Sequence, residues 1–274
     1  MQSEYRQRRA AVLEALGQST AIFCSAPTAV MHNDVDYLYR QDSNFFYLTG
    51  FDEPNAVAVL APSHKDHKFV LFVQPKDKEK ETWSGYRTGV AAAKEKYGAD
   101  EAYPIGELDE KLAEYVCTAP SLYYHFGHDQ AFNNRIIHLW QHLLIKMTKR
   151  GTGPAAIEDS KLLMQQFRRV KTPYEVEKIR QAIAISVEAH NTAREMAQPG
   201  LYEYEIQAAM ENIFRRAGAL GPAYPSIVAS GERACILHYV ENNRPLKEGD
   251  LLLIDAGCAY EYYNADITRT FPVG

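Results

Sequence analysis

The chain has 274 residues, of which 46% are hydrophobic and 24% are charged, and this composition is typical of a folded globular protein rather than a disordered or fibrous one. Its 35 acidic and 30 basic residues give a net charge of -5, which gives no reason to expect nucleic acid or an anionic membrane as a partner. The sequence contains no run of about 20 apolar residues, so we expect no membrane-spanning helix and no membrane partner.

The four cysteines lie far apart in the sequence and include no C-x-x-C pair. This spacing favours free thiols in a reducing compartment over a disulfide framework. The first residues are polar, and the apolar run that follows is interrupted by Glu14 and Gly17, so the start does not resemble a signal peptide. We therefore expect a cytoplasmic protein.

The first part of the chain predicts a mixed α/β domain. Three segments predict helices: 3–16, 107–117 and 130–147. Four short apolar runs, separated by Pro and Gly, predict strands: 21–24, 45–50, 56–60 and 69–73. The charged stretch from Lys76 to Lys80 is most simply a solvated turn. A Gly-Thr-Gly-Pro loop at 151–154 and a helix from Glu158 to about Arg169 lead to the domain boundary, which we place after residue 165.

The second part begins with a clear helix start, because Thr172-Pro173-Tyr174-Glu175 forms a capping box with proline in the first turn. This helix is expected to end before Pro199-Gly200, and a second helix is expected from Tyr204 to Ala217. Four strands should follow: 226–229, 234–239, 251–258 and 264–271. Helices followed by strands predict an α+β domain, with the helices on one face of a largely antiparallel sheet.

Two aspartates occur in the last predicted strands. The apolar residues 251–254 lead directly into Asp255, where a charge is costly unless it is paired or binds a metal. If the hairpin turn is centred between Tyr260 and Glu261, Asp255 lies directly opposite Asp266, with Cβ atoms about 5 Å apart. Opposed carboxylates suit a cation such as Mn²⁺, Mg²⁺ or Ca²⁺. A one-residue slip of the strands, or a turn-capping aspartate, would explain the same pattern without metal, and the residues alone leave these alternatives open.

Residues 252–257, Leu-Leu-Ile-Asp-Ala-Gly, and 266–272, Asp-Ile-Thr-Arg-Thr-Phe-Pro, resemble the metal-binding segment of the pita-bread metallopeptidases. Ser-Gly-Glu at 230–232, with the Cys-Ile-Leu-His-Tyr segment that follows it, narrows the resemblance to the aminopeptidase P (Xaa-Pro aminopeptidase) family. Residues 40–51 and 81–85 resemble the N-terminal domain of the same family. The resemblance implies a creatinase-like N-terminal domain, residues 1–165, followed by the first part of a pita-bread catalytic domain, residues 166–274.

The resemblance also implies an activity, which is the removal of the N-terminal residue from peptides whose second residue is proline. The amide before proline has no N–H and a fixed φ, so ordinary proteases fit it poorly. A complete site in this family uses two metal ions, usually Mn²⁺, and a homo-oligomer is expected. The alternatives are a prolidase, which takes only dipeptides, and a non-catalytic binding or oligomerisation fragment. A creatinase, which works without metal, is more distant.

Position by position, the resemblance implies that Asp255 binds one metal ion and Asp266 bridges both. His238 matches a histidine that helps to stabilise the tetrahedral intermediate, and Tyr224 matches a tyrosine of the substrate pocket. Trp83 matches a tryptophan that reaches the active site of a neighbouring subunit in tetrameric members. Without the resemblance, such a histidine and such aromatic residues would most simply be packing residues. The family also needs one histidine and two glutamates beyond the last residue of this chain, so we expect the 274-residue chain alone to be inactive.

Overall fold

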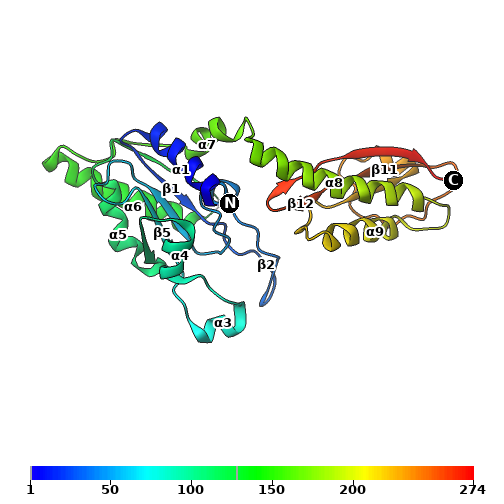
Figure 1. Cartoon of the computed structure of the whole chain (residues 1–274), viewed down its shortest axis with the longest axis horizontal. Coiled ribbons are helices and arrows are strands. Elements are labelled where there is room, and N and C mark those ends of the chain that lie inside the picture. The colour runs from blue at the N-terminus through cyan, green and yellow to red at the C-terminus, as the bar shows by residue number, and fades with distance from the viewer. Residues whose placement is uncertain (1, 128) are drawn as a thin grey trace. The chain divides into compact units, whose positions relative to one another are not determined.

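The computed structural model describes residues 2–127 and 129–274. The chain separates into two compact units, Met1–Val170 and Lys171–Gly274, and their elements are labelled in Figure 1. The first unit mixes helices with a partly parallel sheet, and the second combines two long helices with antiparallel strands. This architecture confirms the predicted combination of an α/β and an α+β fold.

A six-stranded sheet with the order β6-β5-β4-β1-β7-β8 forms the centre of the first unit. Its strands are β1 (Thr20–Cys24), β4 (Val57–Leu60), β5 (Phe69–Val73), β6 (Glu101–Pro104), β7 (Ser121–Tyr123) and β8 (Ala156–Glu158). Both faces of the sheet are covered, because Ala58 and Leu60 belong to one hydrophobic cluster while Val57 and Val59 belong to another. Strands buried on both faces are continuous apolar runs, which is why the sequence predicted β1, β4 and β5 correctly.

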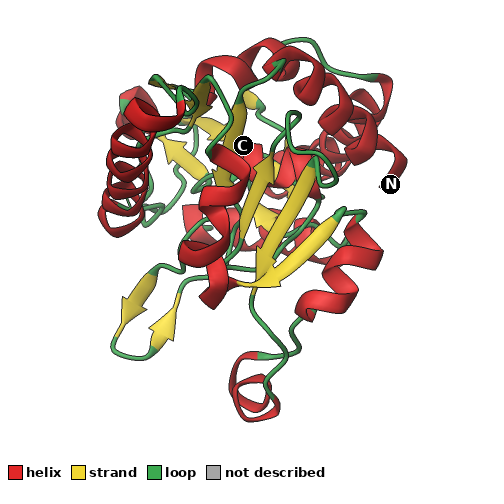
Figure 2. Cartoon of the chain, turned by 90° about the vertical axis from the view of Figure 1, so that its left-hand side faces the viewer, coloured by secondary structure: helices red, strands yellow, loops and turns green. Residues whose placement is uncertain are grey.

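Helices cover the two faces of this sheet, as Figure 2 shows. Those contributing buried residues to the first cluster are α1 (Gln2–Leu16), α2 (Ser43–Thr49), α4 (Gly89–Tyr97) and α7 (Ser160–Arg168). Those contributing to the second are α5 (Leu108–Val116) and α6 (Gln130–Arg150). A short 3-10 helix, η1 (Ile105–Glu107), precedes α5.

Two small elements project from the body of the first unit in Figures 1 and 2. They are the β2 (Val30–His32)–β3 (Val35–Asp36) hairpin and helix α3 (Lys78–Ser84). The Asp77 side chain accepts from the backbone N–H groups of Glu79 and Lys80, so it caps α3. The prediction of a turn through Lys80 was therefore wrong, because this cap starts a helix inside the charged run.

The apolar run at 45–50 forms helix α2 instead of the predicted strand. Asp42 Oδ1 accepts from the N–H groups of Asn44 at 2.9 Å and Phe45 at 2.8 Å, and Gly50 ends the helix in the left-handed region with φ 65°. An aspartate cap before a helix and a glycine after it are strong local signals. Here they outweigh the strand preference of the aromatic residues between them.

The second unit contains the long helices α8 (Pro173–Met196) and α9 (Glu203–Arg216) and two antiparallel sheets, ordered β10-β11-β14 and β13-β12-β9. The strands are β9 (Gly221–Pro222), β10 (Ile227–Ser230), β11 (Leu251–Asp255), β12 (Cys258–Tyr260), β13 (Tyr263–Asn264) and β14 (Thr268–Pro272). The predicted capping box is present: Thr172 N–H donates to Glu175 Oε2 at 2.9 Å, and Glu175 N–H donates to Thr172 Oγ1 at 3.3 Å. Apolar residues of α8 and α9 pack with those of β11 in one core.

The hairpin that carries the two aspartates has a different register from the predicted one. Asp255 lies opposite Thr268, so the predicted direct opposition to Asp266 was wrong. The turn is centred on Glu261 and Tyr262, whose φ values are 46° and 72°, as in a type I′ hairpin turn. The shift is two residues, and side chains alternate with a period of two, so Asp266 remains on the same face as Asp255.

Residues 234–239, which were predicted to be a strand, instead complete the 3-10 helix η2 (Gly231–Cys235) and continue as an irregular loop. Gly231 begins η2 with φ 56°, a conformation that interrupts an extended chain.

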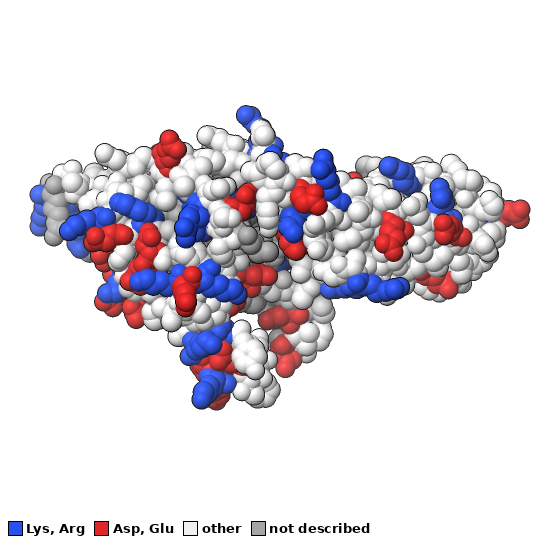
Figure 3. Space-filling model, in the orientation of Figure 1, with Lys and Arg blue, Asp and Glu red and all other residues white. Residues whose placement is uncertain are grey.

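None of the helices in the described residues is both long and apolar enough to cross a membrane. Basic and acidic side chains are interspersed over the face of the molecule shown in Figure 3.

Candidate functional site

One cavity in the second unit collects four of the five predicted site residues. Its volume is about 400 Å³, and its lining consists of Tyr224, Pro225, Ile227, His238, Val240, Asp255 and Asp266. Asp255 ends β11, and Asp266 lies between β13 and β14 on the returning arm of the hairpin. The neighbouring strand β10 pairs with β11, with Ile227 opposite Asp255. This pairing brings the segment with Tyr224 to the same end of the sheet.

A single hydroxyl connects the two carboxylates. Tyr224 Oη lies 2.6 Å from Asp255 Oδ1 and 3.2 Å from Asp266 Oδ1. Burial raises the pKa of Tyr224 well above its usual value, and the two carboxylates beside it raise the pKa further. The hydroxyl therefore keeps its proton and donates to the carboxylates. Both acidic side chains are thus directed toward one point of the cavity.

The other lining residues give the cavity an apolar wall. Pro225, Ile227 and Val240 line it beside the polar groups, and His238 comes from the loop after η2. The sequence analysis did not identify Ile227, Pro225 or Val240 as site residues. Val240 lies two positions after the predicted site residue His238, and this closeness in the sequence is the signal that could have pointed to it.

Trp83, the fifth predicted residue, belongs to the first unit. It lies near the end of α3, and 89% of its surface is exposed. It does not line the cavity of the second unit. Its predicted role involves a neighbouring subunit and stays a prediction.

The donor atoms of this cavity fit part of a metal site. Asp255 and Asp266 offer hard carboxylate oxygens, which suit Mn²⁺, Mg²⁺ or Ca²⁺. Within residues 2–127 and 129–274, no three or more His, Cys, Asp or Glu side chains are grouped so as to hold a metal ion. The described residues therefore supply two ligands of a metal site rather than a complete set.

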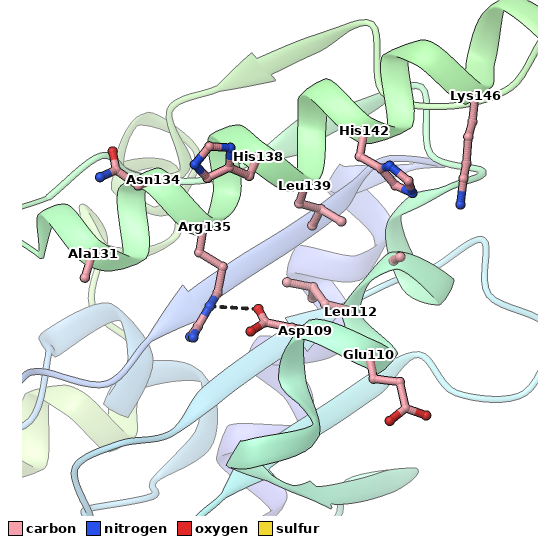
Figure 4. Close-up of a pocket in the computed structure, with 11 residues that line it drawn as sticks. Asp109, Glu110, Leu112, Ala131, Asn134, Arg135, His138, Leu139, His142 and Lys146 are labelled. Carbon is pink, nitrogen blue, oxygen red and sulfur yellow. Dashed lines mark ion pairs between the residues drawn. The ribbon is translucent and has the colours of Figure 1, made fainter.

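A larger hollow of about 700 Å³ lies in the first unit, along α5 and α6 (Figure 4). Arg135 Nε donates to Asp109 Oδ1 at 2.8 Å, so two of its charges are paired with each other. His138 and His142 lie one turn apart on α6, and Figure 4 shows their rings diverging. This hollow is larger than the cavity at Asp255, but its polar groups do not converge on one point.

Two family models match the chain. Residues 5–124 match the N-terminal domain of aminopeptidase P, and residues 177–274 match metallopeptidase family M24. The matched ranges lie in the first and second units, respectively.

Individual proteins give the same result. Xaa-Pro aminopeptidase of Escherichia coli (strain K12) is 40% identical over 273 residues, which are 98% of this chain and 62% of that protein. The structure of Pseudomonas aeruginosa aminopeptidase PepP matches all of this chain with a TM-score of 0.95 and 42% identity, and 62% of that chain is covered. Escherichia coli aminopeptidase P in complex with substrate matches with a TM-score of 0.94 and 38% identity. The chain therefore spans about three fifths of the length of these relatives.

Proposed function

Since the chain belongs to metallopeptidase family M24 and carries the N-terminal domain of aminopeptidase P, we propose that it forms part of a metal-dependent Xaa-Pro aminopeptidase. The observation that carries this proposal is the Tyr224 hydroxyl, which bonds both Asp255 and Asp266 in a cavity that also contains His238. The relatives named Xaa-Pro aminopeptidase support the substrate class, which is a peptide with proline in second position.

In this proposal Asp255 and Asp266 hold divalent metal, with Mn²⁺ as the preferred ion and two ions in a complete site. Bound metal would supply an activated water and polarise the scissile carbonyl. Tyr224 keeps the two carboxylates directed toward one point, so that little reorganisation is needed when they take up their ligand. Oxygen ligands that are themselves hydrogen-bonded are typical of metal sites in proteins.

The remaining lining residues would receive the peptide. His238 can donate a hydrogen bond to an oxygen that gains negative charge during the reaction. Ile227, Pro225 and Val240 form an apolar surface on which a proline ring can pack while water is excluded. Such a wall suits a substrate whose second residue has an apolar ring and no N–H.

We further propose that the active protein is a homo-oligomer in which Trp83 contributes to a neighbouring site. The exposed aromatic residues Trp83 and Tyr86, with 89% and 96% of their surfaces accessible, support a contact at the end of α3. Aromatic residues are enriched at the centres of protein interfaces.

Peptide hydrolysis tests the function. Tripeptides with proline second, matched tripeptides with alanine second, and Xaa-Pro dipeptides would be incubated with Mn²⁺ and the protein. We expect a longer form of the protein that carries this chain to cleave the tripeptides with proline second and the Xaa-Pro dipeptides, and not the alanine tripeptides. We expect no cleavage by the 274-residue chain alone. Asp255→Asn in the longer form is the control and should abolish cleavage.

The alternatives predict other results. Cleavage of dipeptides but not of tripeptides would identify a prolidase. Absence of cleavage by the longer form at all Mn²⁺ concentrations would leave a binding or oligomerisation role and end the enzyme proposal.

A further inference from the structure

One carboxylate of the second unit is fully buried. Glu203 is the first residue of α9, and 0% of its surface is exposed. A buried carboxylate is costly unless hydrogen bonds satisfy it. Its position in the first turn of a helix offsets part of this cost, because the helix dipole favours negative charge there.

Four donors satisfy this carboxylate, two for each oxygen. Oε1 accepts from the backbone N–H and the hydroxyl of Ser230, both at 2.7 Å. Oε2 accepts from the Tyr239 hydroxyl at 2.7 Å and from the Arg244 N–H at 3.0 Å. Burial and the Glu203 carboxylate raise the pKa of Tyr239, so its hydroxyl stays protonated and remains a donor.

These donors lie at the two ends of one segment and at one point inside it. Ser230 ends β10 immediately before the loop of residues 231–243, Tyr239 lies inside this loop, and Arg244 follows it. Glu203 therefore binds both ends of the loop and one residue within it. A free loop of this length would sample many conformations, so this attachment fixes its path.

The same loop carries His238 into the candidate site. Tyr239 has 3% of its surface exposed and points into the protein, whereas the neighbouring His238 and Val240 line the cavity with Asp255. His238 ends a turn, and Tyr239 follows it directly in the chain. Holding Tyr239 in its buried place therefore also fixes the end of the turn that carries His238 at the cavity.

Other contacts also hold the loop. Asn242, with 1% of its surface exposed, donates to the Ser226 carbonyl at 2.8 Å and accepts from Val228 N–H at 3.0 Å. Arg233 donates to Glu241 Oε2 at 2.8 Å across the loop. The Tyr239 hydroxyl also accepts from Arg233 Nη1 at 3.2 Å and from Asn243 N–H at 3.4 Å. Both of these residues lie within the same loop, whereas Glu203 reaches the hydroxyl from α9.

We propose that Glu203 is a positioning residue for the candidate active site, acting through Tyr239 to set the place and orientation of His238. This proposal rests on the proposed function for the catalytic importance of His238, but the coupling of Glu203 to His238 can be measured without activity.

The variant Glu203→Gln tests the coupling, because a glutamine amide has only one acceptor oxygen. Whichever way the amide is turned, its NH₂ group faces either the Ser230 N–H or the Arg244 N–H. One end of the loop is thereby released. Tyr239→Phe is the second variant, since it removes the hydroxyl and keeps the ring.

Histidine side-chain NMR spectra would be recorded for the metal-free 274-residue chain and compared between the wild type and the variants. The His238 signal is identified by its loss in His238→Gln. We expect the His238 signal to shift and broaden in both Glu203→Gln and Tyr239→Phe. Tyr263→Phe is the matched control, because it removes a tyrosine-to-carboxylate hydrogen bond, to Glu175 at 3.2 Å, elsewhere in the same unit. It should lower the melting temperature and leave the His238 signal unchanged.

An unchanged His238 signal in folded Tyr239→Phe, or an equal change in Tyr263→Phe, would overturn the proposal. If Glu203→Gln does not fold, Tyr239→Phe alone still shows whether the His238 signal changes when the hydrogen bond to Glu203 is lost. A protein that shows the NMR coupling but does not cleave peptides would retain this inference and lose the proposed function.

Discussion

The hydroxyl of Tyr224 lies 2.6 Å from Oδ1 of Asp255, at the point where β11 ends. The same hydroxyl is 3.2 Å from Asp266 Oδ1, so one neutral donor stands between two acidic groups on one face of the hairpin. Two negative charges held close to one hydroxyl repel each other. The arrangement therefore places two ligand atoms where a cation can bind. Without a cation, the tyrosine hydroxyl reduces the repulsion between the two carboxylates.

Tyr224→Phe should weaken divalent metal binding, because the carboxylates lose the group that orients them. Changes to residues that hydrogen-bond metal ligands typically cost about 10- to 100-fold in affinity. Titration of the 274-residue chain with Mn²⁺, followed by the electron paramagnetic resonance signal of the free ion, measures the change. Tyr204→Phe, at an exposed position of α9, is the control and should bind as the wild type does. Equal affinities for Tyr224→Phe and the control would contradict a role in orienting the ligands.

Asp255→Asn should change stability in opposite directions with and without metal. In the metal-free chain it removes one of two neighbouring negative charges, so the free energy of unfolding should rise by roughly 0.5 kcal/mol. With Mn²⁺ present, the wild type gains stability in proportion to the logarithm of ion concentration over dissociation constant, whereas the variant should gain almost none. Thermal unfolding with EDTA and with increasing Mn²⁺ measures both effects. Equal Mn²⁺-induced shifts in the two proteins would show that Asp255 is not a ligand.

The features that the sequence predicted correctly have local causes. The capping box at Thr172 and Glu175 is contained in four residues, and the strands β4 and β5 are apolar because both of their faces are buried. The family motifs also named Tyr224, His238, Asp255 and Asp266, which line one cavity, while their roles there stay predictions. Each of these predictions required only short sequence patterns.

Two of the failures, at the hairpin turn and at residues 234–239, concern contacts made over longer distances. The hairpin turn at Glu261 and Tyr262 lacks the Asn-Gly signal of a type I′ turn, and Lys178, from a distant helix, pairs with Glu261 at 2.8 Å. The expected strand at 234–239 became a loop whose path is fixed by Glu203, a residue more than 25 positions away from Ser230 and further from Tyr239. No pattern near either segment shows these partners.

Gly257→Ala should separate the two arms of the hairpin. A Cβ atom at this position would lie 2.0 Å from the Ala265 carbonyl oxygen and 3.1 Å from the Asp266 nitrogen, so the backbone beside Asp266 must move. We expect a loss of about 3 kcal/mol or more in unfolding free energy, together with loss of Mn²⁺ binding. Chemical denaturation and the Mn²⁺ titration measure the two effects. Gly106→Ala, where a Cβ meets nothing within 4 Å, is the control and should change neither. A stable Gly257→Ala variant that binds Mn²⁺ normally would mean that the hairpin tolerates the displacement.

Lys178→Met tests whether the salt bridge to Glu261 holds the turn, and its effect should depend on pH. Glu261 raises the pKa of Lys178, so the stabilisation is fully present below the pKa of an unfolded lysine, about 10.4. It is lost as the pH rises through the higher pKa of the folded state. The variant should therefore be less stable than the wild type by up to about 1 kcal/mol near neutral pH, and the difference should disappear in strong alkali. Urea unfolding across this pH range measures it, with Lys161→Met on the exposed side of α7 as control. A difference that persists unchanged in strong alkali would assign the effect to packing of the lysine side chain rather than to its charge.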